Sequence, residues 1–206
     1  MILDVVEGQA AVGEVLEMDV NEFVGKWDYA TLPANVRIGE SCYLERKDSF
    51  RRFRSECHPG LVLGNGVYVY TWTVFSFEPE ATVIVGDESI LVGAMFWCAE
   101  SITVGKRVTI SYNVTIADSD FHPREPSLRR QDAIAIAPPG DQNSRPPLVT
   151  RPVIIENDVQ IGIGAIILKG VHIGAGAQIG AGSVVTANVP ANAIIVGNPA
   201  RIQNHW

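Results

Sequence analysis

The chain has 206 residues, of which 47% are hydrophobic and 19% are charged, and its formal net charge is −7. This composition is typical of a globular protein and excludes a disordered chain. The negative charge argues against general nucleic-acid binding, which needs a basic surface. No apolar run approaches the roughly 18 residues of a transmembrane helix, so we expect no membrane span.

Residues 1–60 carry only weak repeat signals, and we predict an N-terminal cap or irregular first turns there. The first twenty residues contain acidic side chains and no basic leader, which argues against a signal peptide. The three cysteines, at 42, 57 and 98, cannot all pair and lack the spacing of metal ligands. These features favour a cytoplasmic, reducing setting.

A basic run with two interleaved phenylalanines, Phe50 and Phe53, lies near the end of this segment. Its members are Arg46, Lys47, Arg51, Arg52 and Arg54. Such a run either grips phosphate or forms the solvated face of a short helix or hairpin packed on the first coil. We favour the solvated face.

An apolar residue recurs at every sixth position further along the chain. The members of this early repeat are Val92, Cys98, Val104, Ile110 and Ile116. Val85 precedes Val92 by seven positions, which we interpret as a one-residue corner insertion. A period of six is neither the two of a strand nor the 3.6 of a helix. It is the hexapeptide signature of a β-helix, in which short strands wind round a triangular prism and the apolar residues point inward.

The segment 118–152 interrupts the repeat. It contains prolines at 123, 126, 138, 139, 146, 147 and 152, which exclude most of it from a regular strand ladder. A loop of this length is uncommon in a compact domain unless it is functional or disordered. The loop also contains His122, and histidine is the residue type most often used in general acid–base catalysis. We therefore predict that it is a site loop extruded from the coil.

The repeat resumes after the loop and is most regular there. The inward positions are Ile155, Ile161, Ile167, Ile173, Ile179 and Val185, and each is followed four positions later by a small or β-branched residue. Gly162, Gly174 and Gly180 follow three of them, and we expect glycines to take tight corners that need unusual backbone angles. We place the coil from about residue 60 to 190, in a β-helix domain of residues 61–206.

Two motifs resemble a known family. The stretch NVPANAIIVGNPAR, residues 188–201, resembles the closing signature of the hexapeptide-repeat acyltransferases. The segment VTISYNVTIADSDFHP, residues 108–123, is similar to the one that carries the catalytic histidine in their galactoside, maltose and xenobiotic O-acetyltransferase branch. The resemblance covers about residues 83–202. It implies an all-β fold, a left-handed parallel β-helix, and a homotrimer that binds acetyl-coenzyme A (acetyl-CoA) in the groove between neighbouring prisms.

The resemblance also implies roles for particular residues. His122 would be the general base that takes the proton from an acceptor hydroxyl as it attacks the thioester. Positions along the bound acetyl-CoA would be Gly162, Ile163, Gly180, Ala181 and Thr186, with Arg201 at the nucleotide phosphates. The residues leave open which carboxylate orients His122, and Asp118, Asp120 and Glu125 are the candidates in the same loop.

The chain departs from the family pattern where Gln160, Ala187 and Asn204 stand in place of an aromatic residue and two basic ones. The asparagine that helps hold a sugar acceptor in the galactoside branch also has no clear counterpart near residues 92–94. The main hypothesis is an O-acetyltransferase acting on a sugar or another small hydroxylated acceptor. An N-acyltransferase acting on an amino sugar is one alternative, and a non-catalytic β-helix scaffold with a degenerate site is another. A γ-type carbonic anhydrase would need three histidines round zinc, and only His122 lies in the right region, so no metal is expected.

Overall fold

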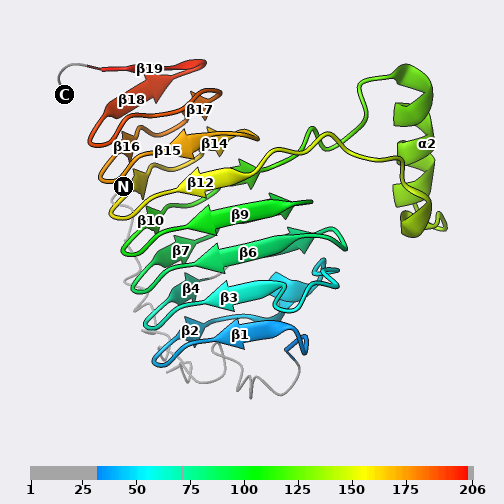
Figure 1. Cartoon of the computed structure of the whole chain (residues 1–206), viewed down its shortest axis with the longest axis horizontal. Helices are drawn as coiled ribbons and strands as arrows, with labels where there is room; N and C mark the ends of the chain where they lie inside the picture. Colours follow the sequence, from blue (N-terminus) through cyan, green and yellow to red (C-terminus); the bar gives the residue numbers. More distant parts are fainter. Residues whose placement is uncertain (1–31, 71, 204–206) are drawn as a thin grey trace, which may run out of the picture.

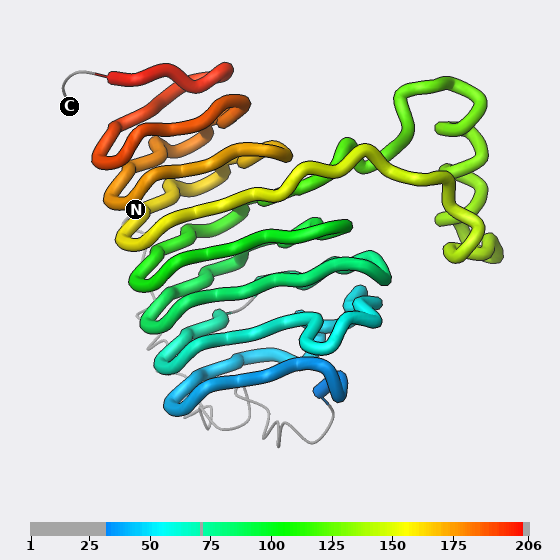
Figure 2. The backbone as a smooth tube through the Cα atoms, viewed as in Figure 1, coloured from blue at the N-terminus to red at the C-terminus, as the bar shows by residue number. Residues whose placement is uncertain are grey.

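The computed structural model describes residues 32–70 and 72–203, which wind into a prism of stacked coils with a long arm on one side (Figures 1 and 2). Three sheets form the faces of the prism, and every strand pair within them is parallel except β18–β19, which is antiparallel. With the hexapeptide period this is a left-handed parallel β-helix, as predicted.

Sheets A, B and C are named here by their strands. Sheet A contains β1 (Val36–Ile38), β3 (Leu61–Leu63), β6 (Thr82–Val85), β9 (Ser101–Val104), β12 (Val153–Ile155) and β15 (His172–Ile173). Sheet B contains β2 (Tyr43–Leu44), β4 (Tyr68–Tyr70), β7 (Ile90–Val92), β10 (Thr109–Ile110), β13 (Gln160–Ile161), β16 (Gln178–Ile179), β18 (Ile194–Gly197) and β19 (Ala200–Ile202). Sheet C contains β5 (Val74–Phe77), β8 (Met95–Cys98), β11 (Thr115–Ala117), β14 (Ile166–Ile167) and β17 (Val184–Val185).

The core consists of inward side chains stacked from coil to coil. The late repeat is confirmed, because all six of its predicted inward residues and the residues four positions after them are buried. In sheet C the stack becomes aromatic toward the N-terminus, where Phe75 and Phe96 lie with ring centroids 5.5 Å apart. Packed rings and branched aliphatic side chains fill the interior of the prism.

The early repeat is correct except at its first member. Leu91, not Val92, pairs with Ile110 and is fully buried, whereas Val92 is half-buried. Val85 and Leu91 are thus six positions apart, and the corner insertion predicted between Val85 and Val92 is wrong. The residues by which this coil exceeds the regular period come after Leu91. Both Phe96 and Cys98 of β8 point inward, which lengthens that strand. Cys98 is buried, as expected of an inward residue.

The glycines after the inward residues meet a different need from the one predicted. Gly162 has an ordinary backbone angle, but a Cβ there would lie 2.6 Å from the backbone nitrogen of Ala181 in the next coil. The left-handed angle falls two positions later, on Gly164 (φ +69°). Close stacking therefore requires the first glycine, and the turn geometry requires the second.

The extra residues of the N-terminal coils collect at one edge of the prism, where the chain passes from sheet C to sheet A. We call this the C–A edge. Phe75 and Val85 are ten positions apart across it, and Phe96 and Val104 are eight apart, whereas Ile167 and Ile173 keep the regular six. Residues 118–152 leave the prism at this same edge.

The extruded segment forms an arm, as Figures 1 and 2 show. Its base is a short antiparallel pairing in which Asp120 N–H donates to Val149 O at 3.2 Å and Arg151 N–H donates to Asp118 O at 2.8 Å. The arm carries helix α2 (Pro126–Ile136) and a 3-10 turn, η2 (Gln142–Ser144). The helix was not predicted. Proline at its first position and a Glu125 side chain that accepts from Leu128 N–H start it, both being regular features of helix N-termini.

The first coil begins earlier than residue 60. Strands β1 and β2 pair in parallel with β3 and β4, so residues 36–44 are stacked as turns of the prism. The basic run forms the 3-10 turn η1 (Lys47–Phe50) and the residues after it, and Phe50 packs on Phe75 at 5.3 Å. Of the segment 1–60 predicted as a cap or irregular first turns, residues 1–31 lie outside the described residues. Neither α2 nor the 3-10 turns of the described segments are long and apolar enough to cross a membrane.

We predict that Ile155→Ala and Ile154→Ala differ sharply in stability. Ile155 is fully buried and Ile154, its neighbour in β12, is 41% exposed. Removing the inward side chain leaves a cavity and should cost about 2–5 kcal/mol of unfolding free energy. The outward replacement should cost less than about 1 kcal/mol. Denaturant unfolding of both variants measures the difference, and equal losses would contradict the inward ladder.

Candidate active site

His122 lies at the C–A edge where the arm leaves the prism. It follows β11 by five residues, and Phe121 before it adopts a left-handed backbone angle (φ 62°) that turns the chain. Its backbone N–H donates to Asp120 O at 2.7 Å. The imidazole is 45% exposed, so one side of the ring is open to an incoming molecule.

Asp132 of α2 orients the imidazole. Its Oδ2 lies 2.5 Å from His122 Nδ1, and its side chain is fully buried. A carboxylate at this distance accepts a hydrogen bond from Nδ1–H, which leaves Nε2 as the unprotonated nitrogen of the neutral ring. The helix that the sequence did not predict therefore supplies the residue that the sequence left open.

Arg145 holds Asp132 from the other side. Its Nε donates to Asp132 Oδ1 at 2.7 Å, and a terminal nitrogen donates to Phe121 O at 3.0 Å. Burial tends to raise the pKa of Asp132, but hydrogen bonds and charge from Arg145 and His122 outweigh it, so the pKa is lowered. Asp132 is thus a carboxylate at neutral pH. Arg145 also pairs with Glu78, which pairs in turn with Arg54.

The three carboxylates predicted as partners of His122 are engaged elsewhere. Asp118 is buried in the C–A edge, where it accepts from the backbone N–H groups of Ala99 and Glu100 at 2.8 and 2.7 Å, and burial raises its pKa. Asp120 pairs with Lys169, which lowers its pKa. Glu125 caps α2. Asp132 was missed because it lies ten residues from His122, and only the fold of the arm brings the two together.

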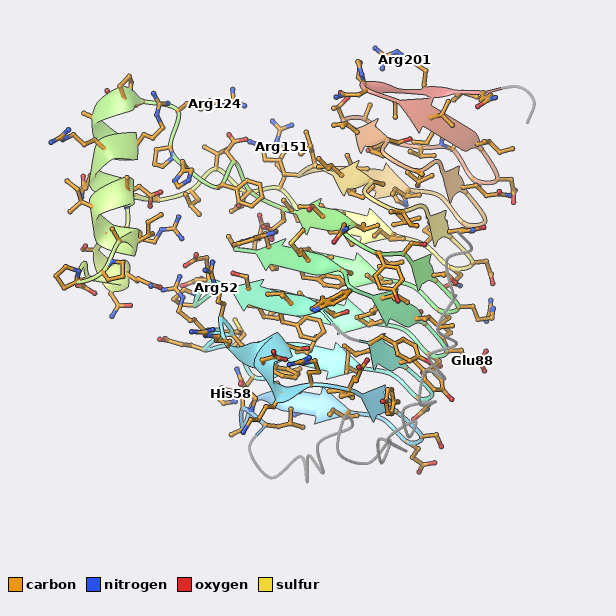
Figure 3. The ribbon with its side chains drawn as sticks, turned by 180° about the vertical axis from the view of Figure 1, so that it is seen from behind. Arg52, His58, Glu88, Arg124, Arg151 and Arg201 are labelled. Carbon is orange, nitrogen blue, oxygen red and sulfur yellow. The ribbon has the colours of Figure 1, made fainter. Side chains whose placement is uncertain are left out.

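A cavity of about 950 Å³ lies beside His122, between the arm and the prism. The prism contributes residues from successive coils at the C–A edge, including Arg51, Arg52, Trp97 and Ala99, and the arm contributes Ile136, Pro138 and Leu148. In Figure 3 Arg52 lies on the edge of the prism that faces the arm. The volume suits a small molecule of the size of a sugar or nucleotide.

Four of the predicted donor-site residues gather at a different edge of the prism, between sheets B and C. Gly162 approaches Ala181 closely, and the carbonyl of Ile163 accepts from the N–H of Gly182 at 2.8 Å in the next coil. Gly162 follows β13, and Gly180 follows β16, the strand that pairs with β13 in the next coil. Ile163 is 56% exposed and Ala181 is also exposed, so this corner presents backbone and apolar surface.

The other two predicted donor residues lie apart from that corner. Thr186 follows β17 and is exposed at the C–A edge, two coils beyond β11. Arg201 is exposed on β19 at the C-terminal end of the prism, where Figure 3 labels it. Within one chain, His122 and the B–C corner are therefore separated by the width of sheet C. Gln160 and Ala187 are described and exposed, and Asn204 lies outside the described residues.

No group of three or more histidine, cysteine, aspartate or glutamate side chains that could hold a metal ion occurs within residues 32–70 and 72–203. His172, which lies in β15 on the late coils of the prism, is exposed on sheet A and pairs with Glu156 at 2.7 Å. His122 is thus distinguished from it by its buried carboxylate partner and its cavity.

Comparison with known proteins identifies the repeat. Residues 152–187 match the model of the family "Bacterial transferase hexapeptide (six repeats)". A 2,3,4,5-tetrahydropyridine-2,6-dicarboxylate N-acetyltransferase of Staphylococcus aureus (strain JH9) is 53% identical over 51 residues. These residues are 25% of this chain and 21% of that protein, so the chain spans about a fifth of the length of the curated relatives it matches.

Solved structures extend the likeness over most of the chain. A hexapeptide-repeat-containing acetyltransferase of Vibrio cholerae O1 biovar eltor, complexed with acetyl-CoA, is 28% identical with a TM-score of 0.54, and the match covers 75% of this chain and 72% of that one. A galactoside acetyltransferase in complex with coenzyme A is 24% identical with a TM-score of 0.52, covers 82% of this chain and 64% of that one, and shows the fold alone. By its repeat and its fold, the chain is similar to the hexapeptide-repeat acetyltransferases.

Proposed function

We propose that the protein is an acetyl-CoA-dependent O-acetyltransferase that acts on a sugar or another small hydroxylated acceptor, with His122 as its general base. The observation that carries this proposal is the His122–Asp132 pair, with Nδ1 and Oδ2 2.5 Å apart, at the mouth of a cavity. A scaffold with a degenerate site would need neither a buried carboxylate nor an arginine behind the histidine. The Vibrio cholerae neighbour, an acetyltransferase complexed with acetyl-CoA, supports the same donor.

The proposed chemistry is direct acyl transfer. His122 Nε2 takes the proton of the acceptor hydroxyl while the oxygen attacks the thioester carbonyl, and a carbon–oxygen bond forms. The carbon–sulfur bond then breaks, and the imidazolium returns the proton to the departing thiolate of coenzyme A. Asp132 keeps Nδ1 protonated and stabilises the positive charge on the ring during this cycle. Arg145 keeps Asp132 ionised and fixed in place.

We further infer that the complete site forms between copies of the chain in a homotrimer. The B–C corner, with Gly162, Ile163, Gly180 and Ala181, lies one sheet width away from His122, which at about 3.3 Å per residue is roughly 15–20 Å. A thioester held at that corner reaches a histidine more directly from a neighbouring prism. Thr186, at the same edge as His122, would line the neighbour's side of the groove, and Arg201 would meet the nucleotide phosphates with its guanidinium.

The alternative acceptor atom is an amine nitrogen. The Staphylococcus aureus relative is named as an N-acetyltransferase, which favours this alternative. The match that supports it extends over 51 residues. An oxygen acceptor must lose its proton as it attacks, which is the step that His122 is oriented to assist. Assays with paired hydroxy and amino sugars distinguish the two.

We predict that His122→Ala binds acetyl-CoA as the wild-type protein does but loses activity. Removing the base should lower turnover by on the order of 10²–10⁴. Calorimetry measures acetyl-CoA binding, and release of the free thiol in the presence of a panel of sugars measures turnover. His172→Ala is the matched control, because that histidine is exposed and does not line the cavity, and it should keep wild-type activity. A His122→Ala enzyme with an unchanged rate would eliminate His122 as the base.

Asp132→Asn should lower kcat by on the order of 10²-fold while the Kd for acetyl-CoA and the KM for the acceptor change little. An amide at this position no longer accepts reliably from Nδ1 and no longer balances the imidazolium, yet it keeps the shape of the side chain. Asp141→Asn is the control, since Asp141 only caps η2 on the same arm. If both kcat and KM remained at wild-type values, Asp132 would have no positioning role.

The shared site predicts that two inactive variants restore each other. His122→Ala lacks the base, and Ala181→Trp blocks the exposed B–C corner with a bulky ring. Trimers refolded from a mixture of the two contain interfaces that combine an intact His122 with an intact corner, so part of the activity should return. Light scattering checks the trimer. Mixed trimers that stay inactive would mean that base and corner act within one chain.

A further inference from the structure

The cavity beside His122 is basic although the chain is acidic. The charged residues that line it include four arginines, Arg51, Arg52, Arg54 and Arg145, and two carboxylates, Glu78 and Asp120. The formal net charge of the whole chain is −7. A concave surface whose charge opposes that of the molecule attracts ligands of the opposite sign.

Two of these arginines are neutralised within the structure and two are not. Glu78 pairs with both Arg54 and Arg145, and Arg145 also holds Asp132. Arg51 and Arg52 have exposed side chains and form no ion pair with any described residue. Their charges therefore remain available to a ligand in the cavity.

An aromatic wall stands beside these free charges. The guanidinium carbon of Arg52 lies 5.9 Å from the ring centroid of Trp97, and Phe121, next to His122, meets Trp97 edge-on at 5.6 Å. Trp97, Phe121 and His122 all line the cavity. The wall thus runs from the Arg52 guanidinium, which lies over the Trp97 ring, to the imidazole. A ligand ring that lies against this wall would place an anionic substituent at one end and a nucleophile at the other.

The basic residues lie apart from the expected donor groove. Arg51 and Arg52 belong to the first coil, on the N-terminal side of the arm, whereas Arg201 lies at the C-terminal end of the prism (Figure 3). Gly162 and Gly180 lie in coils beyond the arm. The charges of Arg51 and Arg52 therefore face the acceptor side of His122.

We propose that the acceptor carries an anionic group, phosphate or carboxylate, which Arg51 and Arg52 bind while the acceptor ring lies against the wall of Trp97 and Phe121. This inference rests on the proposed acetyltransferase function, since it takes His122 as the reacting end of the cavity. Guanidinium groups bind both anions with paired, charge-assisted hydrogen bonds. The basic run is thus a specificity determinant of the acceptor and more than a solvated face.

Calorimetric titrations of three probes test the proposal. The probes are D-glucose 1-phosphate, D-glucuronate and neutral D-glucose, and the proteins are the wild type, the double variant Arg51→Gln/Arg52→Gln and the control Arg46→Gln. Arg46 belongs to the same run but pairs with Asp48 and does not line the cavity. Acetyl-CoA is titrated into each protein separately, and circular dichroism confirms that the exposed substitutions leave the fold intact.

We expect wild type and Arg46→Gln to bind at least one anionic probe about tenfold or more tightly than glucose. The double variant should lose about tenfold or more of that affinity, the effect of removing charged hydrogen bonds, and should keep its Kd for acetyl-CoA. The tighter of the two anionic probes identifies phosphate or carboxylate as the recognised group.

Three results would overturn the proposal: no anionic probe binds better than glucose, the double variant binds them unchanged, or it loses acetyl-CoA affinity instead, which would assign the arginines to the donor. Failure of the wild-type protein to bind acetyl-CoA would refute the proposed function. The separate titrations with the anionic probes would still decide whether Arg51 and Arg52 bind an anion.

Discussion

The structure depends on one constraint, the equal perimeter of stacked coils. Each inward residue must meet its counterpart above and below at the strand spacing of about 4.8 Å, so a regular coil can neither gain nor lose residues on a face. The late coils keep this rule strictly. Ile155, Ile161 and Ile167 each pair with an inward aliphatic residue 18 positions later, in the next coil. Burial of these side chains provides the stability that fixes every other feature.

Any additional residue must therefore leave the prism at an edge, and in this chain the edge is nearly always the same one. Coils up to β11 enlarge the passage from sheet C to sheet A, and the largest enlargement is the arm of residues 118–152. Because successive coils are stacked, these insertions lie above one another. Their alignment builds a cavity whose walls come from segments as distant in sequence as Arg52, Trp97 and Leu148.

The charged groups around that cavity differ in burial, and the buried ones are paired. Asp132 is fully buried, and it remains ionised because Arg145 and His122 surround it. Glu78 compensates Arg145 and Arg54, so the inner part of the network is internally paired. A buried network is favourable when every member is satisfied, and the described residues contain no buried side-chain nitrogen or oxygen without a hydrogen-bond partner. Arg51 and Arg52 lie outside this network, at the solvent-facing rim.

The sequence by itself determined the β-helix, because a six-residue period has only one structural meaning, and it determined the limits of the extruded segment, because prolines cannot join the ladder. Through the resemblance of residues 108–123 to a family motif, it also singled out His122 as the candidate general base. Three features were decided only by the tertiary structure: Asp132 as the partner of His122, Leu91 in place of Val92 in the core, and the place of the basic run at the cavity beside His122. Each of these depends on contacts between residues that are not periodic neighbours. A local sequence pattern predicts the spacing of residues along one strand or coil. The contact of helix α2 with His122, and the position of the first coil beside the same cavity, depend on how the whole chain packs.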